Sequence, residues 1–529
     1  MSNTFVAQRP GGISRRWLAM GALTLALITI GLDQTVLNLA LPTLSNSLHA
    51  SESQLQWFVT AYTLALAAGM LPAGLLGDRY GRKTVLVGAI ALFGVTSIAC
   101  AYAPDANAFI AARAVLGVAG AALLVMSLSV VTVLFSETER PRAMGIWAAG
   151  NFLALPLGPI VGGYVLAHFW WGWVFLMNVP VVLIGLVAVT VFVPQSRSEH
   201  RPSIDLPGVV LSSGGLAMLM YGLVQAGDHG WGSSDAIIPS ISAVAVLIAF
   251  VLWESWLTAK PSGQPLIDLG LFRTRSFTVG VVLAGMGIFG MFGVLFTLPQ
   301  YLQGIMGVDA QGAGLRFLPS IAGLVLGAVP ADRVAARIGA RFTVAIGFAV
   351  LAVGMFLGSW MTATTGDGFI ALFTFIVGVG AGLGLATAVS AAMVELSAER
   401  SGVGGALVQA VVKLGPAFGA TILGSVLNST YQSHVSVSGL PAAAASAAQG
   451  SVFGGLEVAR NLGSPALLDS VRTAFVAGMD DASRVAAIIA VVAVVGAIVL
   501  MPKRATGPAE DEAGAGRKNK SGESAAVLG

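Results

Sequence analysis

Long apolar segments, each close to 20 residues and separated by short polar connections, recur along the whole chain. A bilayer core about 30 Å thick needs about 20 helical residues to cross it, and backbone hydrogen bonds in lipid must be made within the segment. Of the 529 residues, 56% are hydrophobic and 10% are charged, whereas soluble domains carry about 25% charged residues. The sequence therefore excludes a soluble or disordered protein and predicts an all-α membrane protein.

The apolar segments are best divided into fourteen transmembrane spans. The first span is not expected to be a cleaved signal, because it is long and contains an acidic residue, Asp33. The expected spans are residues 17–41, 55–76, 85–102, 109–134, 143–166, 173–193, 206–225, 236–257, 277–298, 313–329, 342–361, 369–389, 404–427 and 485–501.

The basic residues predict the orientation. If the N-terminus is cytoplasmic, 22 of the 28 Lys and Arg residues fall on the cytoplasmic side. The positive-inside rule then places both termini in the cytoplasm and requires an even number of spans. Since Arg far outnumbers Lys and Ala is abundant, we expect a multi-pass protein of a bacterial cytoplasmic membrane.

One connection between two spans has an ordered pattern of glycines and charges. It reads Gly74, Gly77, Asp78, Arg79, Gly81, Arg82 and Lys83. Glycines let two helix ends approach closely, and an acid can cap a helix or pair with a cation. A degenerate copy follows, in which Asp332 and Arg333 precede a further Arg, Gly and Arg, and Asp332 lies 254 residues after Asp78.

This spacing predicts two six-helix halves with two extra helices inserted between them, and internal duplication is typical of transporters. A polar outside connection and a disordered tail complete the chain. The expected parts are a cytoplasmic N-terminus (1–16), an N-terminal half (17–193), a linker with two inserted helices (194–260), a C-terminal half (277–501) with a long outside loop (428–480), and a disordered cytoplasmic tail (502–529). Within that loop, apolar residues at helical spacing from Leu467 to Val476 favour a short interfacial helix.

Residues 74–83 closely resemble the signature cytoplasmic loop between helices 2 and 3 of the major facilitator superfamily. Residues 32–42 resemble the helix 1 motif of its fourteen-span drug:proton antiporters, and Trp171 to Pro180 fit the aromatic start of helix 6. Gly172, where Arg is commoner, associates the chain with the quaternary-ammonium and multidrug efflux branch. The antiporter motif of helix 5, which bends and packs that helix closely, is matched by Gly150, Pro156, Gly158, Pro159, Gly162 and Gly163.

The resemblance implies a major facilitator fold and proton-coupled efflux of hydrophobic, cationic compounds by alternating access. Asp33 is expected to bind the coupling proton, because it is the one acid well inside a span and intramembrane acids are functional by default. Arg113 is its expected partner, since the two residues lie at compatible depths and Arg113 matches the family's helix 4 arginine. A proton or a drug would occupy the carboxylate in turn.

The substrate cavity is less well marked. Lys413 lies near mid-membrane, where family members that export divalent cations tend to carry acids, and Thr60 stands where those members have an acid in helix 2. Both departures argue against a specialist for dications and leave monovalent cations, neutral drugs or anionic solutes open. The weak cavity candidates are Asn38, Trp57, Tyr62, Trp147, Gln409 and Lys413.

Two alternatives stay open at this point. One is a proton-coupled transporter of the same fold for a neutral or anionic metabolite, which would also need Asp33. The other is a membrane-embedded enzyme, which the scattered histidines disfavour, because they form no expected metal-ligand cluster. The glycine pattern at 285–290 lies inside an apolar span and predicts helix packing, not a nucleotide site. We expect a small-molecule substrate, the lipid bilayer as surroundings, no nucleic acid, no metal, no cofactor beyond protons, and function as a monomer.

Overall fold

The computed structural model describes residues 13–135, 139, 143, 146, 157–196, 205–260, 265–267, 269–394 and 401–502. These residues form helices and no strands, so the predicted all-α class is confirmed. Among them, 11 helices are long and apolar enough to cross a membrane, or 12 if the bent pair Ala310–Ala328 and Ala331–Ile338 forms one span. The fourteen-span count is compatible with this result and stays a prediction.

The N-terminal half is built from long helices joined by short, well-capped turns. Ser51 and Gln54 form a reciprocal capping box at the start of α2, which satisfies two backbone donors at the helix end. Asp105 caps α4 by a single contact, in which its side chain accepts a hydrogen bond from the Ala108 backbone N–H. The helices are α1 (Ile13–Leu48), α2 (Glu52–Tyr80), α3 (Arg82–Ala101), α4 (Ala106–Leu134), an apolar helix over Leu157–His168, α6 (Trp173–Leu176) and α7 (Asn178–Phe192).

The C-terminal half repeats this arrangement with a few additional short helices. Its helices are α10 (Arg275–Gln300), α11 (Ala310–Leu315), α12 (Leu318–Ala328), α13 (Ala331–Ile338), α14 (Ala340–Gly358), α15 (Asp367–Val394), α16 (Ser401–His434), α17 (Ala442–Gly450), α18 (Val452–Asn461) and α19 (Pro465–Leu500), with a 3-10 turn at Leu269–Arg273 and a π-turn at Tyr301–Ile305. Each half has its own large apolar core.

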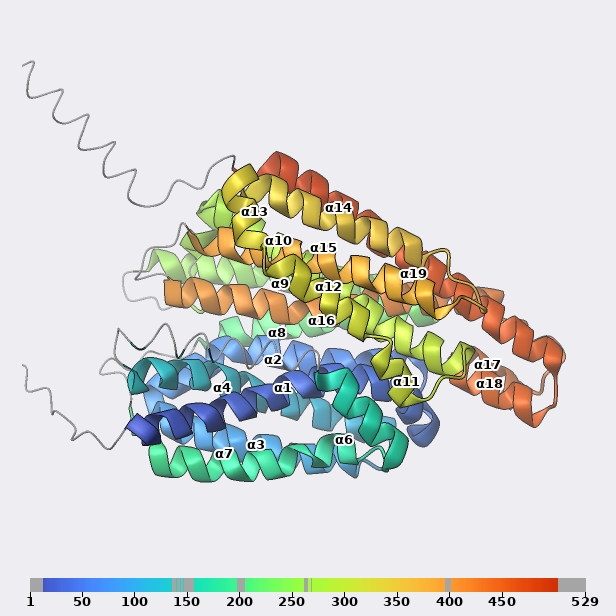
Figure 1. Cartoon of the computed structure of the whole chain (residues 1–529), viewed down its shortest axis with the longest axis horizontal. Coiled ribbons are helices and arrows are strands. Elements are labelled where there is room, and N and C mark those ends of the chain that lie inside the picture. Colours follow the sequence, from blue (N-terminus) through green and yellow to red (C-terminus); the bar gives the residue numbers. More distant parts are fainter. Residues whose placement is uncertain are drawn as a thin grey trace, which may run out of the picture.

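The two halves share one packing pattern. In the N-terminal half, α2 and α3 pack on α4, and α1 and α3 pack on α7. In the C-terminal half, α12 and α14 pack on α15, and α10 and α14 pack on α19. Figure 1 shows these groups as two bundles side by side, with the start of α1 and the end of α19 at the same end of the molecule. The structure thus contains the internal duplication that the repeated loop predicts.

The inserted helices α8 (Leu206–His229) and α9 (Ser234–Ala259) pack on each other, and α8 also contacts α2 and α16. They therefore cover one side of the junction between the halves. Trp253 Nε1 in α9 donates to both carboxylate oxygens of Asp205, at 2.9 and 3.1 Å, and this contact joins the two helices where α8 begins.

The segment expected as a loop at 428–480 is largely helical instead. Helix α16 continues to His434, α17 and α18 follow, and α19 starts at Pro465. The apolar residues that suggested a short interfacial helix belong to the first turns of α19, because Val471 and Phe475 are buried in the core of the C-terminal half. Tyr431 fixes α17 and α18 against α16 by donating to the Ala448 carbonyl at 2.7 Å.

We use "outer end" for the end at which α1 finishes and α2 starts, which the basic residues predict to be extracellular. Below this end, the halves meet closely at two places. Thr60, which lies about two turns into α2, and Thr421 of α16 are hydrogen-bonded at 2.9 Å. On the other side, helix Leu157–His168 meets α11 so closely that a Cβ on Gly314 would lie 2.2 Å from the Pro159 carbonyl oxygen. The outer end is therefore closed in this conformation.

Replacing Gly314 by Ala is expected to open the outer end. The added methyl group cannot fit against the Pro159 backbone, so the closed contact between helix Leu157–His168 and α11 must separate. We expect a membrane-impermeant maleimide to label a cysteine at position 421 at least about fivefold faster from outside. Gly21→Ala is the matched control, because nothing lies within 4 Å of its new Cβ. Equal labelling of both variants would contradict the prediction.

Candidate proton and substrate site

A fully buried ion pair lies in the N-terminal half. Asp33 of α1 is 1% exposed, and its Oδ2 accepts a hydrogen bond from Arg113 Nη1 of α4 at 2.5 Å. Asp33 lies near the middle of the 36-residue α1, far from both helix ends. The structure thus brings together the two residues that helix depth placed at the same level, while their role in coupling stays a prediction.

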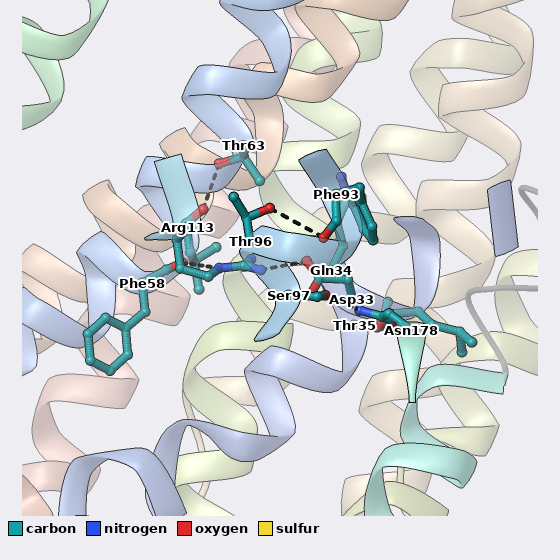
Figure 2. A network of polar contacts seen from close by, with 12 residues as sticks. Asp33, Gln34, Thr35, Phe58, Thr63, Phe93, Thr96, Ser97, Arg113 and Asn178 are labelled. Atoms are coloured by element: carbon teal, nitrogen blue, oxygen red, sulfur yellow. Dashed lines mark hydrogen bonds and ion pairs between the residues drawn. The ribbon is translucent and has the colours of Figure 1, made fainter. Parts of the chain in front are cut away.

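Arg113 is held in place by two further contacts from α2. Its Nε donates to the Phe58 carbonyl oxygen at 3.1 Å, and its guanidinium lies over the Tyr62 ring at 4.2 Å from the centroid. Figure 2 shows Arg113 reaching between Phe58 and Asp33, so one side chain connects α4, α2 and α1. Because a buried arginine needs its charge compensated, these contacts fix the position of the cation beside the carboxylate.

Several polar atoms near the ion pair have no hydrogen-bond partner among the described residues. They are the buried atoms Asp33 Oδ1, the Tyr62 hydroxyl, Gln34 Nε2 and Asn38 Oδ1. Buried polar atoms normally have partners, so unpaired atoms near a buried charge indicate a place where a ligand or a proton binds. Asn38 was predicted as a cavity residue. Gln34 was missed, although Gln34 and Asn38 are four residues apart and so share one helix face in an apolar span.

The other cavity candidates differ in their surroundings. Tyr62 is 0% exposed and packs under Arg113, so it forms part of the ion-pair site, and its role in substrate binding stays a prediction. Trp57 is half-buried and packs on the small apolar cluster that joins Leu64, Met220 and Ala417. Gln409 and Lys413 are half-buried on α16, and no ion pair to Lys413 is found in the part of the chain that the structure describes. Trp147 lies outside the described residues.

The signature loop at residues 74–83, which we expect to act in conformational gating, joins α2 directly to α3 at the end opposite the outer end. Gly77 allows α2 to pack on α4, since a Cβ there would lie 2.3 Å from Met126 Sδ. Lys83 Nζ donates to the Thr190 carbonyl oxygen at 2.8 Å and so holds the loop against α7. Arg79 is exposed, and the side chain of Asp78 lies outside the described atoms.

The two copies of this loop share a backbone feature. Gly81 (φ 104°) ends α2 and starts α3, and Gly339 (φ 86°) ends α13 and starts α14. This left-handed conformation is easy only for glycine, which explains the glycine in both copies. The copies differ in that Asp332 and Arg333 lie exposed on the separate helix α13, whereas α2 is continuous up to its turn.

The antiporter motif positions helix Leu157–His168 on α1. A Cβ on Gly158 would clash with the Thr35 side chain, and a Cβ on Gly162 would lie 2.5 Å from Val36 Cγ1. Gly163 faces the other half, with the Ala310 carbonyl oxygen 2.9 Å from where a Cβ would stand. The small residues thus allow close packing on both sides, and the sealing role of this helix stays a prediction. Gly150 and Pro156 lie outside the described residues.

Two polar contacts could not be predicted from the sequence. Arg316, at the end of α11, pairs through two hydrogen bonds with Asp367, at 2.8 and 2.6 Å. Glu52 is 2% exposed and accepts a hydrogen bond from Gln300 of the other half at 3.2 Å. An acid in the first helical turn is a common helix-start signal, so the sequence indicated nothing further about Glu52.

Comparison with known proteins supports these observations. The family model described as "Major Facilitator Superfamily" matches residues 23–420. The multidrug efflux pump LfrA of Mycolicibacterium smegmatis is 32% identical over 91% of this chain and 96% of the pump. The tetracenomycin C resistance and export protein of Streptomyces glaucescens is 33% identical over 78% of this chain and 76% of its own length. The methyl viologen resistance protein SmvA of Salmonella typhimurium is 31% identical over 87% of this chain and 93% of its own length.

Solved structures with similar folds are also transporters. An inward-facing, unoccupied bacterial homologue of the human lysosomal transporter Spinster superposes with a TM-score of 0.67 at 16% identity, over 93% of this chain and 98% of that chain. A D-xylose-proton symporter gives a TM-score of 0.55 at 15% identity, over 92% of this chain and 98% of that chain.

Two duplicated helical bundles are typical of secondary transporters, and the matched family and the relatives named above are transporters. This chain belongs to the major facilitator superfamily.

Proposed function

We propose that this transporter exports hydrophobic, cationic drugs or toxic compounds in exchange for protons. The observation that carries the proposal is Asp33, a carboxylate buried at membrane depth whose Oδ1 has no partner among the described residues while its Oδ2 binds Arg113. Relatives named for multidrug efflux, methyl viologen resistance, and tetracenomycin C resistance and export support efflux as the direction of transport.

Coupling follows from competition at this carboxylate. Arg113 already compensates the negative charge of Asp33. Asp33 can therefore bind either a proton or a second cation, but not both at once. A substrate cation that approaches Oδ1 favours loss of the proton, and a new proton displaces the substrate. Exchange requires that both events occur at one site that faces each side of the membrane in turn.

The proposal extends to location and assembly. We place both termini in the cytoplasm of a bacterial cell, with the protein in the cytoplasmic membrane, and we propose that one chain works alone with protons as its coupling ion. The basic residues support this orientation. The presence of both six-helix halves and of contacts between them in one chain supports a monomer as the working unit.

The proposed substrates are monovalent rather than divalent cations. Lys413 lies in the membrane-spanning part of α16, and no carboxylate pairs with it in the described ranges. The positive charge of Lys413 repels a divalent cation more strongly than a monovalent one. The difference is about 2 kcal/mol at a distance of about 8 Å and an effective dielectric constant of about 20.

Replacing Lys413 by Met is therefore expected to widen the substrate range. We predict that export of a dication such as methyl viologen improves about tenfold relative to a monovalent dye, because one repulsive charge is removed while the side chain stays unbranched and of similar length. The measurement is competition by each compound against ethidium efflux. Lys413→Arg serves as the control that keeps the charge. An unchanged preference in the Met variant would refute this role of Lys413.

The overall proposal is tested in inside-out vesicles that carry the purified transporter. Ethidium should accumulate in the vesicles when their interior is made acidic. It should leave them when a protonophore collapses this pH gradient. Accumulation that is insensitive to the protonophore would exclude proton coupling.

A further inference from the structure

A second buried carboxylate lies in the contact between the two halves at the outer end. Glu52 is the first residue of α2 and is 2% exposed, and its Oε1 accepts a hydrogen bond from Gln300 Nε2 of α10 at 3.2 Å. Gln300 is 0% exposed. Since α2 and α10 belong to different halves, opening the outer end must break this hydrogen bond and expose Glu52 to the outside solution.

The surroundings of Glu52 disfavour a negative charge while the outer end is closed. Asp228 of α8 is close enough to repel such a charge, and Asn428 Nδ2 holds Asp228 in place at 2.8 Å. No Arg or Lys forms an ion pair with Glu52 in the described part of the chain. A buried carboxylate without a cation is energetically costly, and a proton removes that cost. The other titratable groups on the elements around Glu52 are His229 at the end of α8, Tyr431 and His434 in α16, His49 before α2 and Asp105 before α4.

Gln300 supplies an independent observation that points to a proton. Its Oε1 is buried and accepts no hydrogen bond within the described structure. A carboxylate can only accept from an amide, whereas a carboxylic acid can also donate its O–H to the amide oxygen. A protonated Glu52 therefore provides the donor that Gln300 Oε1 lacks, and the acid and the amide are then joined by two hydrogen bonds.

We propose that Glu52 is a second proton-binding site, which closes the outer gate when it is protonated. Glu52 takes its proton from the outside water while the gate is open, and the acid–amide pair with Gln300 then holds the gate shut. When the gate reopens, the proton on Glu52 returns to the outside solution. Protonation of Glu52 therefore sets the rate at which the transporter turns back toward the cytoplasm after it has released its substrate. This proton does not add to the number of protons transported. The inference rests on the alternating access of the proposed function.

The test measures accessibility of the gate and not transport. The single native cysteine is replaced (Cys100→Ala), and Thr421→Cys is introduced in the closed contact, where Thr421 is 0% exposed. A membrane-impermeant maleimide is applied from outside between about pH 5.5 and about pH 8.5, with Gly366→Cys, at an exposed site, correcting for the reagent's own pH dependence. We expect corrected labelling to rise about tenfold over this range, because loss of the proton opens the gate.

In the Glu52→Gln background, labelling should be slow and independent of pH, since an amide keeps the neutral pair at every pH. Labelling of the Asp228→Asn and Asp33→Asn variants should still depend on pH. This result separates the role of Glu52 from that of the neighbouring Asp228 and from that of the proposed coupling residue Asp33. Gln300→Met offers a second route, and it should raise labelling at about pH 5.5 to about the level found at pH 8.5. A Glu52→Gln transporter with the parent's pH dependence would overturn the proposal, whatever the result of the efflux assay.

Discussion

Transporter carrying Asp33→Asn is expected to lose gradient-driven efflux almost completely, by about 100-fold or more, while it still exchanges labelled for unlabelled ethidium across the membrane. An amide neither binds the coupling proton nor carries the charge that attracts a cationic substrate, but it retains the shape of the side chain and can still accept from Arg113. The two assays together separate loss of coupling from loss of folding. Rates are measured in proteoliposomes with and without an imposed pH gradient.

Asp367→Asn is the matched control for this prediction. Asp367 also pairs with an arginine, Arg316, but lies exposed at the outer end of α15. The Asp367→Asn transporter should therefore retain normal proton coupling. Full gradient-driven transport by the Asp33→Asn variant would show that the coupling proton binds elsewhere.

The second large effect is expected on stability, from Arg113→Ala. Removing the guanidinium leaves the buried Asp33 without Arg113, its one ion-pair partner among the described residues. It also removes the contacts of Arg113 to Phe58 and Tyr62. Breaking a buried ion pair at one partner costs about 3–5 kcal/mol. We therefore expect a clear drop in unfolding free energy, measured by denaturant titration in detergent, together with loss of efflux.

A double variant shows whether the ion pair itself is responsible. Combining Arg113→Ala with Asp33→Asn removes the unpaired charge, so the double variant should be more stable than Arg113→Ala alone by about 2 kcal/mol. Strictly additive losses would instead show that Arg113 acts through packing on Tyr62 and not through Asp33.

Much of the site could be predicted from the sequence, because its determinants are local or repeated. The scarcity of charge made Asp33 conspicuous, and counting residues from helix ends placed Arg113 at its depth. The glycines of the repeated loop predicted a close approach of two helix ends, and the structure shows that Gly81 and Gly339 form these turns with a positive φ. Each of these inferences used the properties of one helix or one turn, without knowledge of which helices are neighbours.

The parts that could not be predicted depend on contacts between distant segments. Glu52 and Gln300 are 248 residues apart, and their contact depends on how the two halves meet. Tyr62 was predicted only as a weak cavity candidate, and its contact with Arg113 could not be predicted because the sequence does not reveal which face of α2 lies against Arg113. The long start of α19 was missed for a similar reason, since its first turns are stabilised by burial against α16 and α18 and not by lipid.

The central claim is that a proton and a drug compete for Asp33. It is tested most directly by adding substrate to the purified transporter in weakly buffered detergent solution and recording proton release with a pH indicator. We predict that ethidium releases protons from the wild-type protein and releases none from Asp33→Asn at saturating substrate. Equal proton release from both proteins, with equal binding of ethidium, would contradict the account.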